Sequence, residues 1–114
     1  MTRINCVPVT ELTQKHLVAE YRELPRARHW QIKDRALPPT YRMGKGHCLF
    51  FHDKGRWLMK RHAELIAEMK RRGYQANLPV VDLTHWPVGA LGDWTPGDDD
   101  MDINRQRIAE RINR

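Results

Sequence analysis

The sequence predicts an all-α fold, with residues 1–114 forming a single compact domain of three main helices and long irregular connections. Three observations support this prediction. Apolar residues recur at helical spacing in three separate segments. The stretches between those segments carry glycines and prolines, which discourage regular structure. A chain of 114 residues can bury one core, whereas two half-chains would be too short to fold alone.

The first predicted helix is interrupted by a proline. Thr10 or Thr13 can serve as its N-cap. One apolar face recurs at positions i, i+4 and i+7, and its residues are Leu17, Tyr21 and Leu24. Because Pro25 removes a backbone donor and crowds the preceding turn, we expect a kink there. A helical continuation over residues 27–36 should then end at the proline pair 38–39.

Two further helices are predicted in the second half of the chain. One starts near Asp53 and ends at Gly73, a favourable C-terminal cap after three basic residues. Its inward residues should be Leu58, Leu65, Ile66 and Met69. The other follows the acidic run 98–100, whose carboxylates suit the positive end of a helix. Its inward residues should be Met101, Ile108 and Ile112. Residues 48–51 or 78–81 are the alternatives for a short strand.

Charge and composition limit the classes of function. The net charge of +6 and a pI near 9.7 indicate a polyanionic partner, and the basic excess belongs to residues 1–78. No apolar run approaches the roughly 20 residues of a membrane span, and no secretory signal is evident, so we expect a cytoplasmic protein without membrane contact. Cys6 and Cys48 lack metal-ligand or disulfide-framework spacing, so we expect reduced thiols and no metal. A metal held by two of the six scattered histidines is the alternative.

The first helix also presents a candidate site. At 100° per residue, Glu20 and Glu23 fall within about 40° of His16, beside the apolar face. Arg22 and Arg26 flank Glu23 on its other side. Geometry alone favours the alternative, a solvated face on which Glu23 pairs with one of these arginines.

Six segments carry a resemblance to a known family. They are MTRIN at 1–5, HLVAEYRELPR at 16–26, GKGHCLFFHDK at 44–54, KRHAELIAEMKRRGY at 60–74, GDWTP at 92–96 and MDINRQRIAERINR at 101–114. In collinear order over nearly the whole chain, they resemble the bacteriophage endonuclease V family of pyrimidine-dimer DNA glycosylases. The resemblance implies a compact all-helical fold that acts on damaged double-stranded DNA. The oligomeric state is left open, with a monomer as the simpler expectation. It also implies a glycosylase step and a lyase step that nicks the abasic site, without metal or organic cofactor.

The resemblance implies that Thr2 and Glu23 are catalytic. The nucleophile would be the α-amine of Thr2, exposed when Met1 is removed. An α-amine titrates near 7.7–8.0 and a lysine near 10.4, so roughly a third of the former is neutral around pH 7.5. Attack on the sugar C1′ would expel the base and leave an iminium. Glu23 would stabilise positive charge on the sugar and then assist proton removal at C2′. An ordinary frayed terminus is the alternative for Thr2.

Six further residues are implied to bind DNA by their match to the family, and they are Arg3, His16, Arg22, Arg26, Arg107 and Arg111. The arginines should hold phosphates beside the lesion, although each can also be a solvated surface charge. Gly44 and Gly46 can permit close approach to DNA or can be turn glycines, and we favour the turn.

The sequence departs from the family in two places. The segment between Arg26 and Gly44 is shorter, and the aromatic C-terminal tail associated with lesion contact is lacking. The cognate lesion therefore stays open. Trp30, Trp57, Trp86 and Trp94 can replace the tail by stacking, but tryptophans more often belong to a core. A non-catalytic DNA-binding protein of the same fold is the alternative function, and an RNA-cleaving nuclease is a further one.

Overall fold

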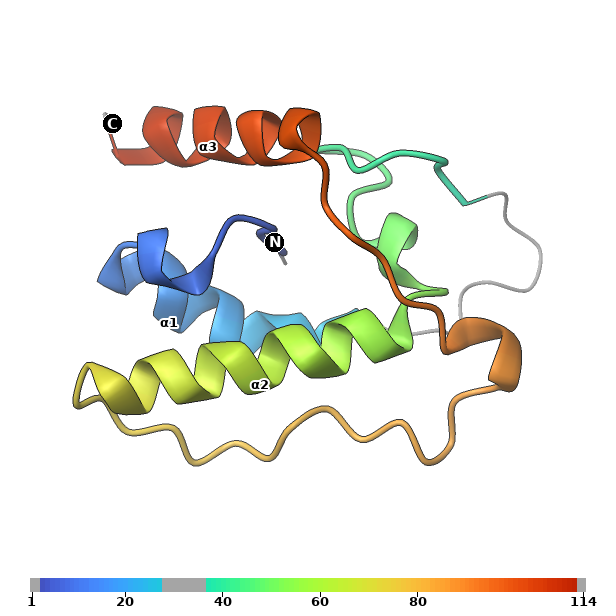
Figure 1. Cartoon of the computed structure of the whole chain (residues 1–114), viewed down its shortest axis with the longest axis horizontal. Coiled ribbons are helices and arrows are strands. Elements are labelled where there is room, and N and C mark those ends of the chain that lie inside the picture. The colour runs from blue at the N-terminus through green and yellow to red at the C-terminus, as the bar shows by residue number, and fades with distance from the viewer. Residues whose placement is uncertain (1–2, 28–36, 113–114) are drawn as a thin grey trace.

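Three α-helices make up most of the regular structure in the computed structural model, which describes residues 3–27 and 37–112 (Figure 1). They are α1 (Gln14–Glu23), α2 (Gly55–Arg71) and α3 (Asp98–Ile112). Short 3-10 turns lie between them, over Val9–Glu11, Leu24–Arg26, Leu49–Phe51 and Val88–Ala90. Within the described ranges the only β pairing is an isolated bridge between Lys54 and Leu91, so neither alternative strand forms. The predicted all-α fold with three main helices and long connections is confirmed.

Helix α1 is capped by Thr13 and ends at Glu23, two residues before Pro25. The Thr13 hydroxyl oxygen accepts a hydrogen bond from the backbone N–H of His16, so Thr13 is the cap. Pro25 has no N–H to donate to the carbonyl of Tyr21, four residues earlier, and His62 Nε2 donates to that oxygen instead, at 3.0 Å. The chain then makes one 3-10 turn and becomes extended at Ala27 (φ −74°, ψ 114°). The prediction of a kinked helix continuing through residue 27 is therefore wrong, and residues 28–36 lie outside the described part.

Helix α2 follows the sequence prediction closely. Its C-cap is Arg72, and Gly73 has φ +85°, the left-handed conformation that glycine adopts without strain. The inward face is as predicted, with Leu58, Leu65 and Met69 buried and Ile66 partly buried. The helix starts two residues later than Asp53, because the Asp53 carbonyl accepts instead from Gly92 N–H at 2.9 Å.

The buried residues of helix α3 differ from those that the sequence predicted. Met101 and Ile108 pack against the core only in part, and Ile112 is 55% exposed, so its predicted burial is wrong. The most deeply buried residue of α3 is a polar one, Asn104, at 0% exposure. An amide can occupy that position because hydrogen bonds satisfy it, as described below. The acidic run forms the first turn, and the Asp100 carboxylate accepts from the Gly97 N–H.

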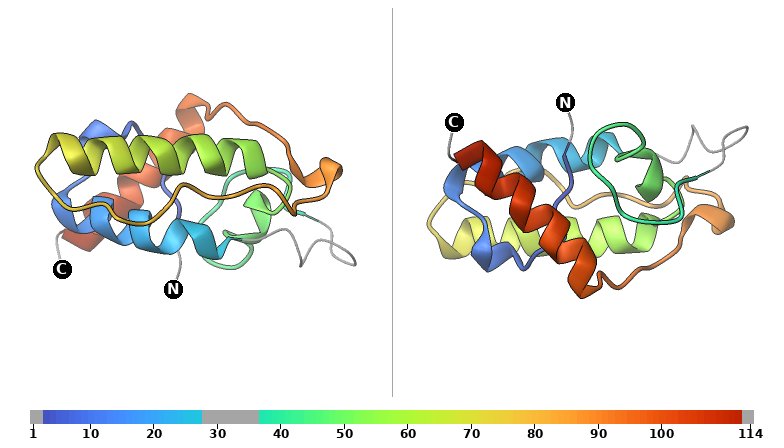
Figure 2. Two further views of the ribbon diagram at one scale, coloured as in Figure 1. Left: turned by 90° about the horizontal axis from the view of Figure 1, so that it is seen from below. Right: turned by 90° about the horizontal axis from the view of Figure 1, so that it is seen from above.

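The N-terminal segment lies between α3 and the packed pair α1 and α2. Figure 1 shows it at mid-height, and Figure 2 shows α3 crossing over it. Its apolar residues Ile4 and Val7 are fully buried. They join a core that includes Leu17, Leu24, Phe51, Leu58 and Leu65. The fold thus encloses the segment that leads to the amino terminus.

The aromatic residues are largely structural. Trp57 is 8% exposed and stacks on Phe51, and Trp94 stacks on Tyr41. Trp86 packs partly buried against the core, and Trp30 lies outside the described residues. The turn interpretation also applies to the two glycines of the 44–46 loop, whose φ angles are +73° and +87°.

Other sequence expectations concern thiols, metals and membranes. Within the described residues neither cysteine forms a disulfide; Cys6 is buried and Cys48 is half-buried. Within residues 3–27 and 37–112, no three His, Cys, Asp or Glu side chains gather as metal ligands would. In the same ranges no helix combines the length and apolar character needed to cross a membrane.

Candidate active site

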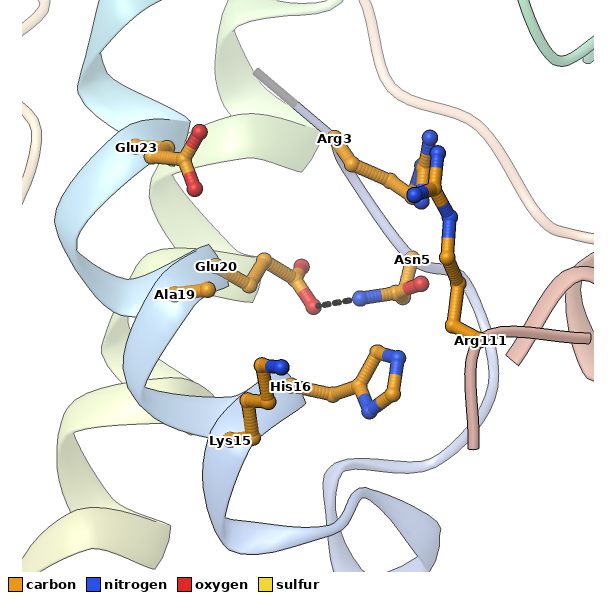
Figure 3. Close-up of a pocket in the computed structure, with 8 residues that line it drawn as sticks. All are labelled: Arg3, Asn5, Lys15, His16, Ala19, Glu20, Glu23 and Arg111. Atoms are coloured by element: carbon orange, nitrogen blue, oxygen red, sulfur yellow. Dashed lines mark hydrogen bonds between the residues drawn. The ribbon is translucent and has the colours of Figure 1, made fainter. Parts of the chain in front are cut away.

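A pocket of about 400 Å³ opens between the N-terminal segment, α1 and the end of α3 (Figure 3). Eight residues line it: Arg3, Asn5, Lys15, His16, Ala19, Glu20, Glu23 and Arg111. Four of them, Arg3, His16, Glu23 and Arg111, were predicted as site residues from the sequence. The pocket therefore brings together residues from the two ends of the chain.

Helical spacing explains the contribution of α1. His16, Glu20 and Glu23 stand at i, i+4 and i+7, so they share the face that looks toward the N-terminal segment. Arg22 and Arg26 project to the other side of Glu23. They line a more open neighbouring pocket along α1 that shares Lys15, Ala19 and Glu23 with the first. Glu23 thus stands at the border between the two pockets.

The two carboxylates of this face have different partners. The side chain of Glu20 is 0% exposed, and Arg61 of α2 donates to it twice, Nε to Oε2 at 2.8 Å and Nη2 to Oε1 at 3.0 Å. The side chain of Glu23 is 23% exposed, and its ion pair with Arg26 is loose, at 4.0 Å. Glu20 is therefore occupied in the core, whereas the carboxylate of Glu23 stays accessible from the pocket.

Arg3, Lys15 and Arg111 give the pocket its positive charge, and Arg107 lies close to Arg3. Burial lowers the pKa of Arg3, and the positive charges of Arg107 and Arg111 lower it further. Figure 3 shows the guanidinium of Arg111 beside that of Arg3. Arg107 has only a 3.8 Å contact with Glu110, and its buried Nε has no hydrogen-bond partner within the described residues. Clustered guanidinium groups with unused donors are suited to phosphate oxygens.

His16 has a fixed orientation at the base of the pocket. Its Nδ1 lies 2.7 Å from the hydroxyl oxygen of Thr13, the residue that caps α1. Burial lowers the pKa of His16, and the positive charges of Arg3, Lys15 and Arg111 act in the same direction. The imidazole is therefore neutral near pH 7 and can donate or accept one hydrogen bond in the pocket.

Comparison with known families assigns the chain. Residues 1–82 match the sequence model of the family described as pyrimidine dimer DNA glycosylase. This match covers 82 of 114 residues, and it includes the N-terminal segment, α1 and α2. The chain belongs to the pyrimidine dimer DNA glycosylase family. Family membership indicates a DNA-repair function of the glycosylase type, with DNA as the substrate.

In this member of the family, the predicted site residues fall into three groups. Arg3, His16 and Glu23 lie in the central pocket and within the matched residues, and Arg22 and Arg26 lie beside it. Arg107 and Arg111 come from α3, beyond residue 82, but Arg111 lines the same pocket. Thr2 lies outside the described residues.

The sequence analysis did not identify the residues that hold the N-terminal segment in place. The Ile4 N–H donates to His47 Nε2 at 2.8 Å, and the Ile4 carbonyl accepts from the Tyr41 hydroxyl at 2.9 Å. Asn5, next in the chain, donates through Nδ2 to Glu20 Oε1 at 2.9 Å. Further contacts come from Arg61 and Asn104. The spacing of Asn104, Arg107 and Arg111 at i, i+3 and i+7 is the one sequence signal that places an amide on the same helix face as the arginines.

Proposed function

We propose that this family member is a DNA glycosylase with coupled abasic-site lyase activity, in which the α-amine of Thr2 is the nucleophile and Glu23 is the catalytic carboxylate. The observation that carries the proposal is the placement of Glu23 in one pocket with Arg3, the residue to which Thr2 is bonded. A pyrimidine dimer in duplex DNA is the proposed lesion, on the basis of family membership.

Peptide geometry supports the choice of amine. Consecutive Cα atoms are ~3.8 Å apart, so residue 2 cannot stray far from Arg3. Arg3 is held because Ile4, which follows it, is fixed on both its N–H and its carbonyl. The positive charge around Arg3 also favours a neutral amine, because nearby cations disfavour protonation. A neutral α-amine near pH 7.5 is the form that can attack.

The proposed reaction proceeds in two stages. The amine nitrogen forms a bond to the sugar C1′, the glycosidic bond breaks, and the base leaves with the electron pair and takes up a proton. Ring opening gives an iminium between residue 2 and C1′. Glu23 stabilises this positive charge and then accepts a proton from C2′. The electrons of that C–H bond form a C=C bond and expel the 3′ phosphate, and water finally hydrolyses the imine.

The arginines are placed to bind phosphates at two different positions along the DNA. Arg3 and Arg111 in the pocket, with Arg107 beside them, suit the phosphates that flank the attacked sugar. Arg22 and Arg26 lie along the outer side of α1 and suit phosphates farther along the same strand. His16 is placed to hydrogen-bond the sugar or a phosphate as a neutral group.

Borohydride trapping tests the proposal. Duplexes carrying a cyclobutane dimer or an abasic site are incubated with protein and sodium borohydride, which reduces an imine to a stable amine. Peptide mapping should place the DNA adduct on residue 2, and acetylation of the α-amine should abolish both trapping and strand cleavage while DNA binding persists.

Lys15 supplies the matched control, because it is the other primary amine that lines the pocket. Lys15→Arg keeps the charge and removes the amine, so trapping should continue at the wild-type rate. An adduct mapped to Lys15, or its loss in this variant, would overturn the mechanism. Binding without any adduct would support a non-catalytic DNA-binding protein instead.

A further inference from the structure

We propose that Asn104 is a positioning residue, which couples phosphate binding on α3 to the placement of the N-terminal nucleophile. This inference rests on the proposed function of the N-terminal amine. It assigns a role to a buried amide that lies beyond the residues matched to the family.

Every polar atom of the Asn104 side chain is directed at the N-terminal segment. Its Oδ1 accepts from the N–H groups of Cys6 at 2.8 Å and Val7 at 3.1 Å. Its Nδ2 donates to Asn5 Oδ1 at 2.7 Å. One side chain therefore binds three consecutive residues of a segment that, within the described ranges, belongs to no helix or sheet. These hydrogen bonds fix the backbone of residues 5–7 relative to α3, as pairing with a neighbouring strand would.

The contacts of Asn5 determine which way its side-chain amide points. Asn5 Nδ2 donates to Glu20 Oε1, and Glu20 is held by Arg61, which also donates to the Val7 carbonyl at 2.6 Å. An ionised carboxylate only accepts hydrogen bonds, so Asn5 must direct its NH₂ to Glu20 and its oxygen to Asn104. The chain of bonds from α2 through α1 to α3 thus has a single consistent orientation.

The same face of α3 bears the phosphate-binding arginines. Asn104, Arg107 and Arg111 stand at i, i+3 and i+7, and both arginines act electrostatically on Arg3. A shift of α3 toward or away from a bound phosphate would therefore move Asn104 and, with it, residues 5–7. Buried polar networks often give no more stability than apolar packing, so a positioning role accounts for an amide here better than stability does.

The test compares Asn104→Asp and Asn104→Leu with a control, Gln106→Leu, which alters an exposed polar residue of the same helix. Three quantities are measured on the full chain: the single-turnover rate of borohydride trapping, the affinity for abasic duplex DNA, and hydrogen exchange of the amides of residues 4–7. A displacement of about 1 Å can slow a reaction on the order of 100-fold, so we expect a loss up to that size in Asn104→Leu. DNA affinity and the control should stay at wild-type levels.

Asn104→Asp gives a signature that loss of packing would not produce. The ionised aspartate keeps both acceptor contacts but cannot donate to Asn5 Oδ1, whereas the protonated acid can donate. The ratio of the variant's trapping rate to that of the wild type should therefore rise as the pH falls. The ionisable groups that act on Cys6, whose N–H Asn104 binds, are Arg61, Asp100, Tyr41 and Glu20. These groups and Cys6 are present in both proteins, so the ratio cancels their effects.

The outcomes separate this inference from the proposed function. Trapping at wild-type rate in both Asn104 variants would overturn the positioning role and leave the nucleophile intact. Absence of an adduct at residue 2 in the wild type would overturn the proposed function. In that case hydrogen exchange still decides the inference, because unchanged protection of residues 4–7 in Asn104→Asp would refute it. If Asn104→Leu does not fold, the pH-dependent ratio of Asn104→Asp is the deciding measurement.

Discussion

Glu20 and Glu23 lie one turn apart on the same face of α1, yet the fold gives them opposite surroundings. The Glu20 side chain is fully buried and bound twice by Arg61. The Glu23 side chain is 23% exposed, and its ion pair with Arg26 is loose, at 4.0 Å. A carboxylate already neutralised in the core cannot respond to charge that develops on a substrate. These different surroundings indicate a structural role for Glu20 and a reactive role for Glu23.

Glutamine substitutions should separate these two roles. Glu23→Gln should abolish strand cleavage while leaving the melting temperature and DNA affinity near wild type, because the negative charge that it removes is partly exposed and only loosely paired with Arg26. Glu20→Gln should lower the free energy of unfolding by about 3–5 kcal/mol, because it leaves Arg61 buried without its counter-charge. Cleavage assays and denaturant unfolding measure the two effects. Wild-type cleavage by Glu23→Gln would contradict the assignment.

Two buried histidines should make stability depend on pH. His62 donates from Nε2 to the Tyr21 carbonyl and accepts at Nδ1 from Val81 N–H. His47 accepts at Nε2 from Ile4 N–H and donates from Nδ1 to the Arg42 carbonyl. Each ring needs one nitrogen without a proton. Burial is the main cause that lowers the pKa of both residues below 6.5.

The sign of this dependence follows from proton uptake. Below pH 6.5 the unfolded chain protonates these histidines before the folded chain does, so the free energy of unfolding falls as the pH falls. The slope is about 1.4 kcal/mol per pH unit for each histidine that stays neutral in the fold. Stability should be greatest above pH 6.5, as measured by denaturant unfolding between pH 5 and 8. His62→Gln should flatten the slope, the exposed His85→Gln should not, and a flat wild-type profile would refute the prediction.

The regular elements of the fold were predictable because their signals are local. The apolar spacing of α2 and the left-handed glycine at its end define that helix without reference to the rest of the chain. The three site residues of α1 share a face for the same reason. The resemblance to the family supplied their roles, which spacing alone left undecided between a site and a solvated face.

The features that the sequence did not predict depend on contacts between residues far apart in the chain. Arg61 counts as a surface charge in the sequence, but it is 4% exposed because its partners Glu20 and Val7 are 41 and 54 residues away. Asn104 is buried by contacts to residues nearly a hundred positions earlier, which no local pattern reveals. The helix predicted beyond Pro25 does not continue, because the backbone is extended at Ala27. The Tyr21 carbonyl, which the proline leaves without a backbone donor, is bound by His62, 41 residues away.

The loop that carries Tyr41 and His47 should be sensitive to Gly46→Ala. Gly46 has φ +87°, and an added Cβ would lie 3.2 Å from the Pro38 side chain. A left-handed conformation costs a residue with a Cβ about 1–2 kcal/mol, so stability should fall by at least that amount. Strand cleavage should fall as well, because Tyr41 and His47 hold Ile4. Gly89→Ala is the control, since it has open space and no positive φ. Equal effects of both substitutions would argue against loop strain.

The salt dependence of DNA binding should identify the arginines that contact phosphate. Arg111 lines the pocket and Arg107 lies near Arg3, whereas Arg105 on the same helix is paired with Glu11 at 2.9 Å. Each lost phosphate contact makes the plot of log affinity against log salt shallower by about 0.9. Arg107→Ala and Arg111→Ala should therefore each reduce the slope by roughly that amount, and Arg105→Ala should leave it unchanged. Fluorescence anisotropy on an abasic duplex between low and moderate salt measures these slopes. Arg105 is a suitable control because it carries the same charge on the same helix. An equal reduction of the slope in all three variants would mean that α3 attracts DNA only by its overall positive charge. It would then make no defined phosphate contacts.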